Sequence, residues 1–96
     1  MKIKQTDVFQ KWFDKLRDNS ARIKIYRRIE LLEKNNYFGD HRTIGGGVSE
    51  MRIKYGPGYR LYYTMRENEI VILLCGGDKD SQVRDRALAK ELVKEV

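Results

Sequence analysis

Hydrophobic residues in the first third of the chain recur with a helical period. From Val8 to Leu16 they are spaced three or four positions apart, which predicts an amphipathic helix over about 7–17 with Asp7 as its N-terminal cap. Polar residues then break this pattern, and a second apolar stripe predicts another helix over 21–35. The second stripe consists of Ile25, Ile29 and Leu32, broadened by Tyr26 and Leu31.

In the second half of the chain the period changes from 3.6 to 2. Residues 36–48, which contain three consecutive glycines, are expected to form a loop. Alternation of apolar and polar residues then predicts two strands, one on each side of Gly56–Gly58. The run from Ile70 to Cys75 is apolar at every position, as expected for a central strand covered on both faces. A short first strand over 2–5 and a final helix over about 82–94 complete the prediction.

The expected order of elements is therefore β-α-α-β-β-β-α, in a single α+β domain over 1–96. Helices joined by so short a link are expected to form an antiparallel helical hairpin. One face of a small antiparallel sheet must cover that hairpin, because no other surface can bury Trp12 and Phe13. The opposite face is expected to stay open or to be partly covered by the C-terminal helix.

The segment MRIKYGPGYRLYY, residues 51–63, predicts a β-hairpin with its turn at Gly56–Gly58. Side chains alternate between the faces of a strand, so the polar residues of this hairpin are expected to share one face. Like charges directly opposite each other destabilise a ladder by roughly 0.2–1 kcal/mol. The expected pairs are Tyr55 with Tyr59, Lys54 with Arg60, and Arg52 with Tyr62.

Such a cluster of cations predicts an anion-binding surface. An anion between Lys54 and Arg60 would replace their repulsion by charge-assisted hydrogen bonds, and the planar fork of arginine suits phosphate. The chain carries 20 Lys+Arg against 14 Asp+Glu, a net charge of +6 at pH 7, which favours nucleic acid or an acidic protein as partner. The alternative is that Glu50 and Glu67 neutralise this face and that the net charge serves only solubility.

Lys79 lies in the segment GGDKDSQ, directly after the predicted central strand. It is expected at the end of the sheet, where it either joins the same basic surface or pairs with Asp78 or Asp80. Gly76 and Gly77 lack the GK[ST] ending of a phosphate-binding loop, so they predict a bulge or a cap instead.

Other kinds of chemistry have little support in the residues. Cys75 is the only cysteine, so neither an internal disulfide nor a cysteine-based zinc site is expected. His41, the only histidine, lies in the predicted loop, where a surface role is favoured over that of a general base. No Ser/His/Asp set, metal-ligand cluster or cofactor motif is visible. Apolar stretches of signal-peptide or membrane-spanning length are also missing, which favours a cytoplasmic protein without membrane contact.

Two segments, MRIKYGPGYRLYY and VILLCGGDKDSQVRD, resemble the RelE/ParE superfamily of toxins from type II toxin–antitoxin systems. The resemblance is nearest to the HigB-like, phage-derived Gp49-like branch, the addiction-module killer proteins, and it spans nearly the whole chain. It implies a RelE-like toxin that cleaves messenger RNA, typically on the translating ribosome and without a metal, and that a cognate antitoxin silences. The chain has no helix-turn-helix motif, so operator binding is expected of the antitoxin.

The resemblance also assigns roles to particular residues. Arg60 matches the arginine that follows Gly-Tyr at the start of the second hairpin strand, and Arg52 and Lys54 match the two basic residues of the first. Lys79 matches the lysine of the GGDK motif, so these four are the expected catalytic residues. RelE carries a tyrosine in its C-terminal segment, and the residue nearest to that place here is Arg84. The expected substrate-binding residues are Tyr62, Arg66 and Arg84.

RNA cleavage of this kind begins when a 2′-hydroxyl attacks the adjacent phosphate, and it leaves a 2′,3′-cyclic phosphate. Arg60 and Arg52 are expected to clamp the phosphate, while Lys54 stabilises the transition state or acts as acid or base. Tyr62 is expected to stack on a base or to transfer a proton. Two alternatives remain open: a ParE-like inhibitor of DNA gyrase, and a non-catalytic module that binds nucleic acid or protein through the same face.

Overall fold

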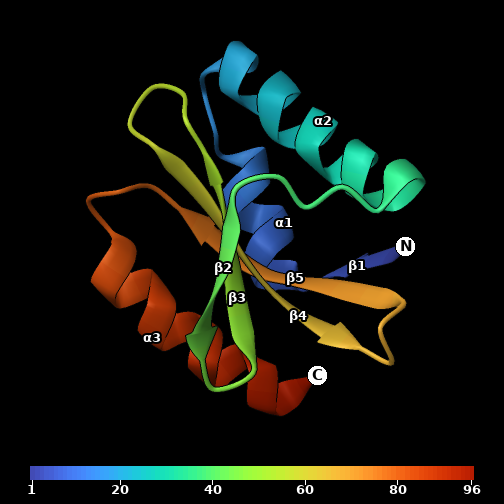
Figure 1. Cartoon of the computed structure of the whole chain (residues 1–96). Coiled ribbons are helices and arrows are strands. Elements are labelled where there is room, and N and C mark those ends of the chain that lie inside the picture. Colours follow the sequence, from blue (N-terminus) through green and yellow to red (C-terminus); the bar gives the residue numbers. More distant parts are fainter.

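The computed structural model describes all residues from 1 to 96, and a five-stranded sheet lies at its centre (Figure 1). Its strands are β1 (Lys2–Gln5), β2 (His41–Gly45), β3 (Val48–Ile53), β4 (Tyr59–Arg66) and β5 (Ile70–Gly77). They lie side by side in the order β1-β5-β4-β3-β2. β1 pairs parallel with β5, whereas the other neighbours are antiparallel, so the sheet is mixed and not purely antiparallel as predicted.

Three α-helices cover the sheet and confirm the predicted α+β class, although the chain contains one strand more than the predicted order β-α-α-β-β-β-α. They are α1 (Asp7–Asp14), α2 (Asn19–Asn35) and α3 (Gln82–Leu92), the last followed by a 3₁₀ turn over Val93–Glu95. α1 and α2 contribute buried residues to one face of the sheet, and α3 contributes to the other. The sheet is therefore the middle layer of the molecule. None of the helices is both long and apolar enough to cross a membrane.

Side-chain caps define where the first two helices begin. Thr6, not the predicted Asp7, caps α1: its Oγ1 accepts a hydrogen bond from the Phe9 backbone N–H at 3.1 Å and donates to the Leu74 carbonyl at 2.6 Å. The cap therefore also ties α1 to β5. Asp18 caps α2 by accepting bonds from two backbone N–H groups of its first turn.

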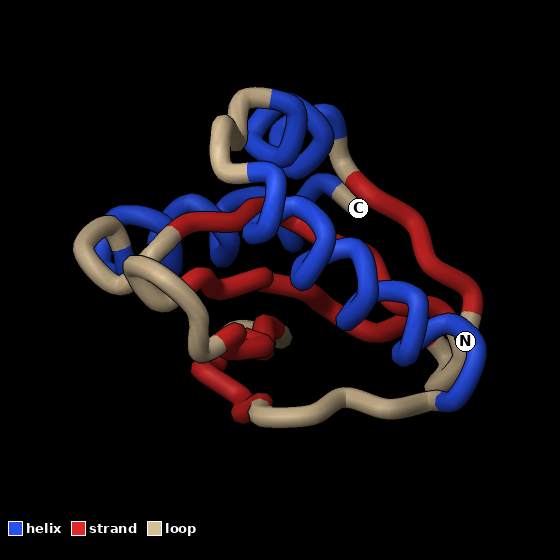
Figure 2. Tube along the Cα trace, turned by 90° about the horizontal axis from the view of Figure 1, so that it is seen from above, coloured by secondary structure: helices blue, strands red, loops and turns tan.

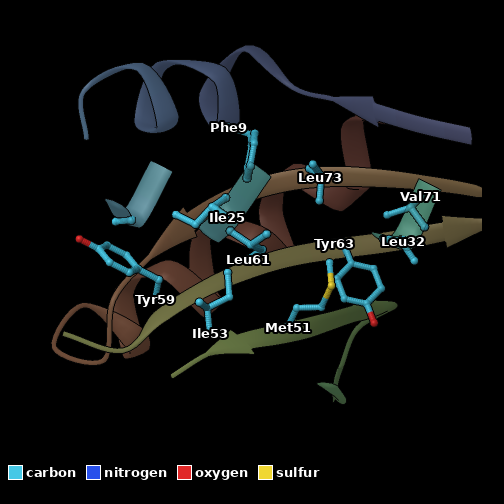
Figure 3. Packing of buried hydrophobic residues seen from close by; sticks show 11 residues of the cluster. Phe9, Ile25, Leu32, Met51, Ile53, Tyr59, Leu61, Tyr63, Val71 and Leu73 are labelled. Atoms are coloured by element: carbon cyan, nitrogen blue, oxygen red, sulfur yellow. The ribbon is translucent and has the colours of Figure 1, made fainter. Parts of the chain in front are cut away.

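The larger core lies between the sheet and the pair α1 and α2. In Figure 3 the side chains of Phe9 and Ile25 point toward Leu61 and Leu73 of the sheet. Burial of such side chains stabilises the fold by about 1.5–3 kcal/mol each. The buried members are Phe9, Ala21, Ile25, Leu32, Met51, Ile53, Tyr59, Leu61, Tyr63, Val71 and Leu73.

A second cluster lies on the opposite face, under α3, and consists of Val48, Tyr62, Leu74, Cys75 and Ala89. It confirms that the C-terminal helix partly covers this face. The glycine pair at the end of β5 allows the close approach on both faces. A Cβ atom on Gly76 would collide with the ring of Trp12, and one on Gly77 would collide with the carboxylate of Asp85. The predicted bulge or cap at this pair is wrong, because the register shift in β5 lies between Leu73 and Cys75.

The predicted loop over 36–48 contains a strand. After an extended connection that follows α2 (Figure 2), residues His41–Gly45 pair with β3 as the edge strand β2. Four of its five residues are exposed, so it lacks the apolar alternation from which a strand is predicted. Gly45, the last residue of β2, and the two glycines after it adopt positive φ angles of 91°, 65° and 81°, which side chains rarely tolerate, and they lead the chain into β3.

Candidate functional site

The β3–β4 hairpin has a different register from the predicted one. Ile53 pairs with Tyr59 and Arg52 pairs with Arg60, a shift of two residues. The shift arises because the turn takes residues 54–58, closed by hydrogen bonds from Tyr55 N–H to the Ile53 carbonyl and from Gly58 N–H to the Tyr55 carbonyl.

A shift of two leaves each side chain on its predicted face, because strand side chains alternate with period two. Arg52 and Arg60 therefore share a face, as predicted, and they stand directly opposite each other. Lys54 lies in the turn, outside the ladder, so the predicted pair of Lys54 with Arg60 does not form.

At the turn end of the hairpin the surface forms a hollow of about 270 Å³, here called the turn-end hollow. It contains three of the four predicted catalytic cations, and Asp40 is the one carboxylate in its wall. The wall consists of Asp40, Arg52, Ile53, Lys54, Gly58, Tyr59 and Arg60. The hollow is thus strongly basic, and phosphate is the kind of group that arginine and lysine together bind well.

Arg52 is held in the hollow by Asp40. Its Nη2 lies 2.9 Å from Asp40 Oδ1, and its backbone N–H donates to the Asp40 carbonyl at 2.8 Å. The hydrogen bond from Arg52 lowers the pKa of Asp40, so this carboxylate is ionised at neutral pH. About a third of each side chain is exposed, and water weakens ion pairs in such places. An incoming phosphate can therefore compete for Arg52.

Arg60 is held more firmly, by the turn itself. Its side chain is only 13% exposed, and its Nη1 donates to the Gly58 carbonyl at 2.9 Å. Its Nε is buried without a hydrogen-bond partner, 3.9 Å from Glu50 Oε2. The side chain of Arg60 therefore has a fixed position in the wall of the hollow.

Lys79, the fourth predicted cation, lies beside the same turn. Its backbone N–H donates to the Pro57 carbonyl at 3.3 Å, and its Cβ lies 3.6 Å from the position that a Cβ on Gly58 would take. The Asp78 carboxylate accepts hydrogen bonds from the backbone N–H groups of Asp80 and Ser81, and no ion pair between Asp78 and Lys79 forms. Lys79 is exposed at the edge of the hollow and not part of its wall.

The predicted substrate-binding residues do not join the hollow. Tyr62 is fully buried under α3, so its ring cannot stack on a base in this structure. Burial, together with the nearby Glu50 carboxylate, raises the pKa of Tyr62 to about 12, so its hydroxyl stays protonated at neutral pH. Its hydroxyl oxygen has no hydrogen-bond partner. The predicted roles of Tyr62 in stacking and proton transfer are therefore not supported.

The other two predicted substrate-binding residues, Arg66 and Arg84, also lie outside the hollow. Arg66 is at the other end of β4, roughly 20 Å from Arg60 at the rise of a strand. It donates to Thr64 Oγ1 at 3.1 Å and to the carbonyl of Val96 at 3.2 Å. Arg84 projects from α3 with 80% of its side chain exposed, 3.5 Å from an oxygen of Asp85.

A buried carboxylate lies on the same face of the sheet, beneath α3. Glu50 is fully buried, and its Oε1 accepts hydrogen bonds from Arg42 Nε at 2.8 Å and from Arg86 Nη2 at 3.0 Å. Burial raises the pKa of Glu50, but the hydrogen bonds and the positive charges of Arg42 and Arg86 together outweigh it, and the pKa is lowered overall. We call Glu50, Arg42, Arg60 and Arg86 the Glu50 cluster.

Sequence reasoning missed the contribution of β2 to both groups. Asp40 precedes β2 and Arg42 lies within it, in the segment that was predicted to be a loop. No local signal could place them, because only the pairing of β2 with β3 brings them to Arg52 and Glu50. His41 does not line the hollow; its ring lies against Phe38, with Nδ1 2.7 Å from the Gly39 carbonyl. No group of three or more His, Cys, Asp or Glu residues that could hold a metal ion is present.

Solved structures of RelE toxins share this fold. A free double arginine-to-alanine mutant of E. coli RelE matches with a TM-score of 0.66 and 20% identity, over 99% of this chain and 96% of that one. The toxin fold of the intact E. coli RelBE toxin–antitoxin complex matches with a TM-score of 0.66 and 15% identity, over 80% of this chain and 94% of that one. At these identities the likeness establishes the RelE-like fold, which confirms the predicted fold class.

The family model of the phage-derived protein Gp49-like family matches residues 11–94, so the chain belongs to this family. An uncharacterized protein of Haemophilus influenzae is 43% identical over 96 residues, covering 100% of this chain and 96% of that protein. The Gp49-like branch, predicted from the hairpin and the strand-to-helix segment, is thereby confirmed.

Proposed function

We propose that this chain is the toxin of a toxin–antitoxin pair and that it cleaves messenger RNA in the turn-end hollow. Membership of the Gp49-like family and the fold shared with RelE support the toxin assignment. The observation that carries the ribonuclease assignment is the wall of the hollow, where Arg52, Lys54 and Arg60 face a single carboxylate. That surplus of cations suits one phosphate diester and the charge that builds on it during cleavage.

The proposed reaction needs no cofactor. The 2′-oxygen of a ribose forms a bond to the neighbouring phosphorus, and the bond from phosphorus to the 5′-oxygen breaks. The products are a 2′,3′-cyclic phosphate and a 5′-hydroxyl. One proton must leave the attacking 2′-hydroxyl, and one must reach the departing 5′-oxygen. Negative charge grows on the two non-bridging oxygens between these events, and fixed cations stabilise it.

Each cation has a proposed part in this reaction. Arg60, fixed by Gly58, holds one non-bridging oxygen, and Arg52 turns from Asp40 toward the other. Lys54, in the wall of the hollow, takes part in no ion pair, and its ammonium group donates a proton to the 5′-oxygen. The 2′-hydroxyl proton leaves to water on the open side of the hollow. Lys79, at the edge, adds positive charge without touching the reacting atoms.

The partners follow from the same proposal. The hollow has few groups that could read a base, so we propose that the translating ribosome presents the messenger RNA strand to it. The RelE relative was solved in a complex with RelB, its antitoxin, and a cognate antitoxin is likewise the proposed protein partner here.

The test is primer extension on translated transcripts after induction of the chain in growing cells. Wild type is expected to create new 5′ ends, and Lys54→Ala and Arg60→Ala are each expected to reduce cleavage about 100-fold or more. Lys54 is exposed and outside the ladder, so its variant keeps the fold even if Arg60→Ala does not.

Arg66→Ala is the matched control, because it removes an arginine from the same strand roughly 20 Å away. It is expected to cleave like wild type. Growth arrest that persists in folded Lys54→Ala, with intact transcripts and an SOS response, would instead identify a gyrase inhibitor. Growth arrest by wild type without any new 5′ ends would instead indicate a non-catalytic binding module.

A further inference from the structure

A second basic depression lies next to the turn-end hollow, between α2 and the start of the hairpin turn. It has a volume of about 230 Å³, and we call it the α2 groove. Its wall contains four cations and no carboxylate. The lining residues are Lys24, Arg27, Arg28, Leu31, Ile53, Lys54 and Tyr55.

One of these cations has a structural role that fixes the walls of the groove. Arg28 donates from Nη1 to the Arg52 carbonyl at 2.8 Å and from Nη2 to the Phe38 carbonyl at 2.9 Å. These bonds attach α2 to the end of β3. The spacing between the helix and the hairpin is therefore set before any ligand arrives, which lowers the entropic cost of binding.

The other cations are free to bind a ligand. Lys24, Arg27 and Lys54 are all exposed, and none of them forms an ion pair. The Lys24 ammonium lies over the Tyr55 ring, 5.1 Å from its centroid. Asp18 reaches the groove only indirectly, because its Oδ2 accepts a hydrogen bond from the Tyr55 hydroxyl at 3.2 Å. The groove thus combines unpaired charge with an aromatic wall, the combination that binds single-stranded nucleic acid.

The groove and the hollow are continuous. Ile53 and Lys54 line both of them, so a chain that leaves the hollow across Lys54 enters the groove directly. The geometry points to one extended ligand for both. We infer that the α2 groove binds the RNA backbone next to the linkage held in the hollow, with Lys24 and Arg27 contacting phosphates. This inference rests on the proposed ribonuclease function of the hollow.

RNA is favoured over an acidic protein segment because of the apolar part of the wall. Leu31, Ile53 and Tyr55 offer a surface for sugars and bases between the cations. An acidic peptide would have its carboxylates satisfied by the same cations but would gain little from these side chains.

The test is the salt dependence of binding to a single-stranded RNA of about ten nucleotides, fully 2′-O-methylated so that it cannot be cleaved. For single strands the slope of log K against log [salt] changes by about 0.7 per phosphate contact. Lys24→Gln/Arg27→Gln is expected to reduce the slope by about 1.4 relative to wild type. The matched control, Lys2→Gln/Lys4→Gln, removes the same charge from exposed positions of β1 and is expected to keep the wild-type slope.

Equal slopes for the groove variant, the control and wild type would overturn the inference, as would a wild-type chain that does not bind this RNA at low salt. So would a groove variant that retains RNA binding but loses binding of poly-glutamate, because the groove would then be a protein site. These outcomes are separate from the cleavage test. If wild type cleaves and Arg60→Ala does not, but Lys24→Gln/Arg27→Gln keeps the wild-type slope, only the proposal for the groove is refuted. If Lys54→Ala cleaves like wild type, the proposed function of the hollow is refuted.

Discussion

The Glu50 cluster and the turn-end hollow lie on one sheet, share Arg60, and have opposite surroundings. In the Glu50 cluster, three arginines surround one carboxylate that is fully buried under α3. In the hollow, Arg52, Lys54 and Arg60 surround the carboxylate of Asp40, which is 32% exposed. The ratio of cations to carboxylates is the same in both groups, so counting charges does not separate them.

Burial separates them. A buried carboxylate needs hydrogen-bond and ion-pair partners, and Glu50 receives them from Arg42 of β2 and Arg86 of α3. The Glu50 cluster therefore has a structural role. The hollow is open to water, its one ion pair is weak, and Lys54 has no ion-pair partner, so its cations are available to a ligand. A basic cluster therefore indicates a binding site only where its carboxylates leave some cations unpaired and exposed.

The largest effect is expected from the centre of the Glu50 cluster. Glu50→Gln leaves Arg42 and Arg86 without their anion beneath α3, and removing one member of a buried pair costs about 3–5 kcal/mol. Arg42 is half exposed and Arg86 about a quarter exposed, so water offsets part of this loss. We expect the free energy of unfolding, measured in urea, to fall by about 3 kcal/mol.

Glu91→Gln is the matched control. Glu91 forms an exposed ion pair with Lys94 at 3.4 Å, and pairs of this kind contribute below about 1 kcal/mol. Equal losses of stability in the two variants would show that the Glu50 cluster is no more structural than a surface pair, and the contrast with the hollow would disappear.

A smaller effect is expected when acid removes the charge of Glu50. The folded pKa of Glu50 is lowered from its usual value of 4.5, so its contribution to stability is complete above that value and is lost as pH falls through the folded pKa. The stability difference between wild type and Glu50→Gln should therefore shrink below about pH 4.5. Other carboxylates titrate in both proteins and cancel in the difference.

Urea unfolding of both proteins at neutral pH and at about pH 3.5 measures this change. The corresponding difference for Glu91→Gln should change much less, because its ion pair is exposed. A wild-type advantage that stays constant with pH would mean that Glu50 stabilises the fold through packing and not through its charge.

The sequence predicts which face each hairpin residue takes, but not which residues meet. Face depends only on alternation along the strand, and Arg52 and Arg60 lie where alternation puts them. Register depends on how many residues the turn takes, and the sequence does not distinguish a turn over 54–58 from one over Gly56–Gly58. The shift of two residues exchanged Lys54 for Arg52 as the partner of Arg60.

Contacts between elements that are distant in the sequence could not be predicted for a similar reason. Arg86 belongs to α3 and Arg42 to β2, and both reach Glu50 only after the sheet and helix have packed. The positions of Arg42 and Arg86 in the sequence give no indication that both contact Glu50. The burial of Tyr62 has the same origin, because alternation gave its face and only the position of α3 decided that this part of the face is covered.

The smallest effect is expected from Tyr62→Phe, which tests the boundary between the two groups. The hydroxyl of Tyr62 is buried without a hydrogen-bond partner, a situation that usually costs about 1–3 kcal/mol. Its removal should leave the free energy of unfolding unchanged or raise it by up to about 1 kcal/mol. Cleavage by the variant should equal that of wild type, because the ring lies under α3 and outside the hollow.

Both quantities are needed to interpret this variant, since urea unfolding reports on the buried hydroxyl and primer extension reports on the reaction. A variant that is as stable as wild type but has lost cleavage would mean that the hydroxyl meets the substrate. Because Tyr62 is fully buried in this structure, α3 would then have to move away from the sheet during the reaction. The Glu50 cluster, which holds α3 through Arg86, would in that case be a latch on the active site and not a separate structural group.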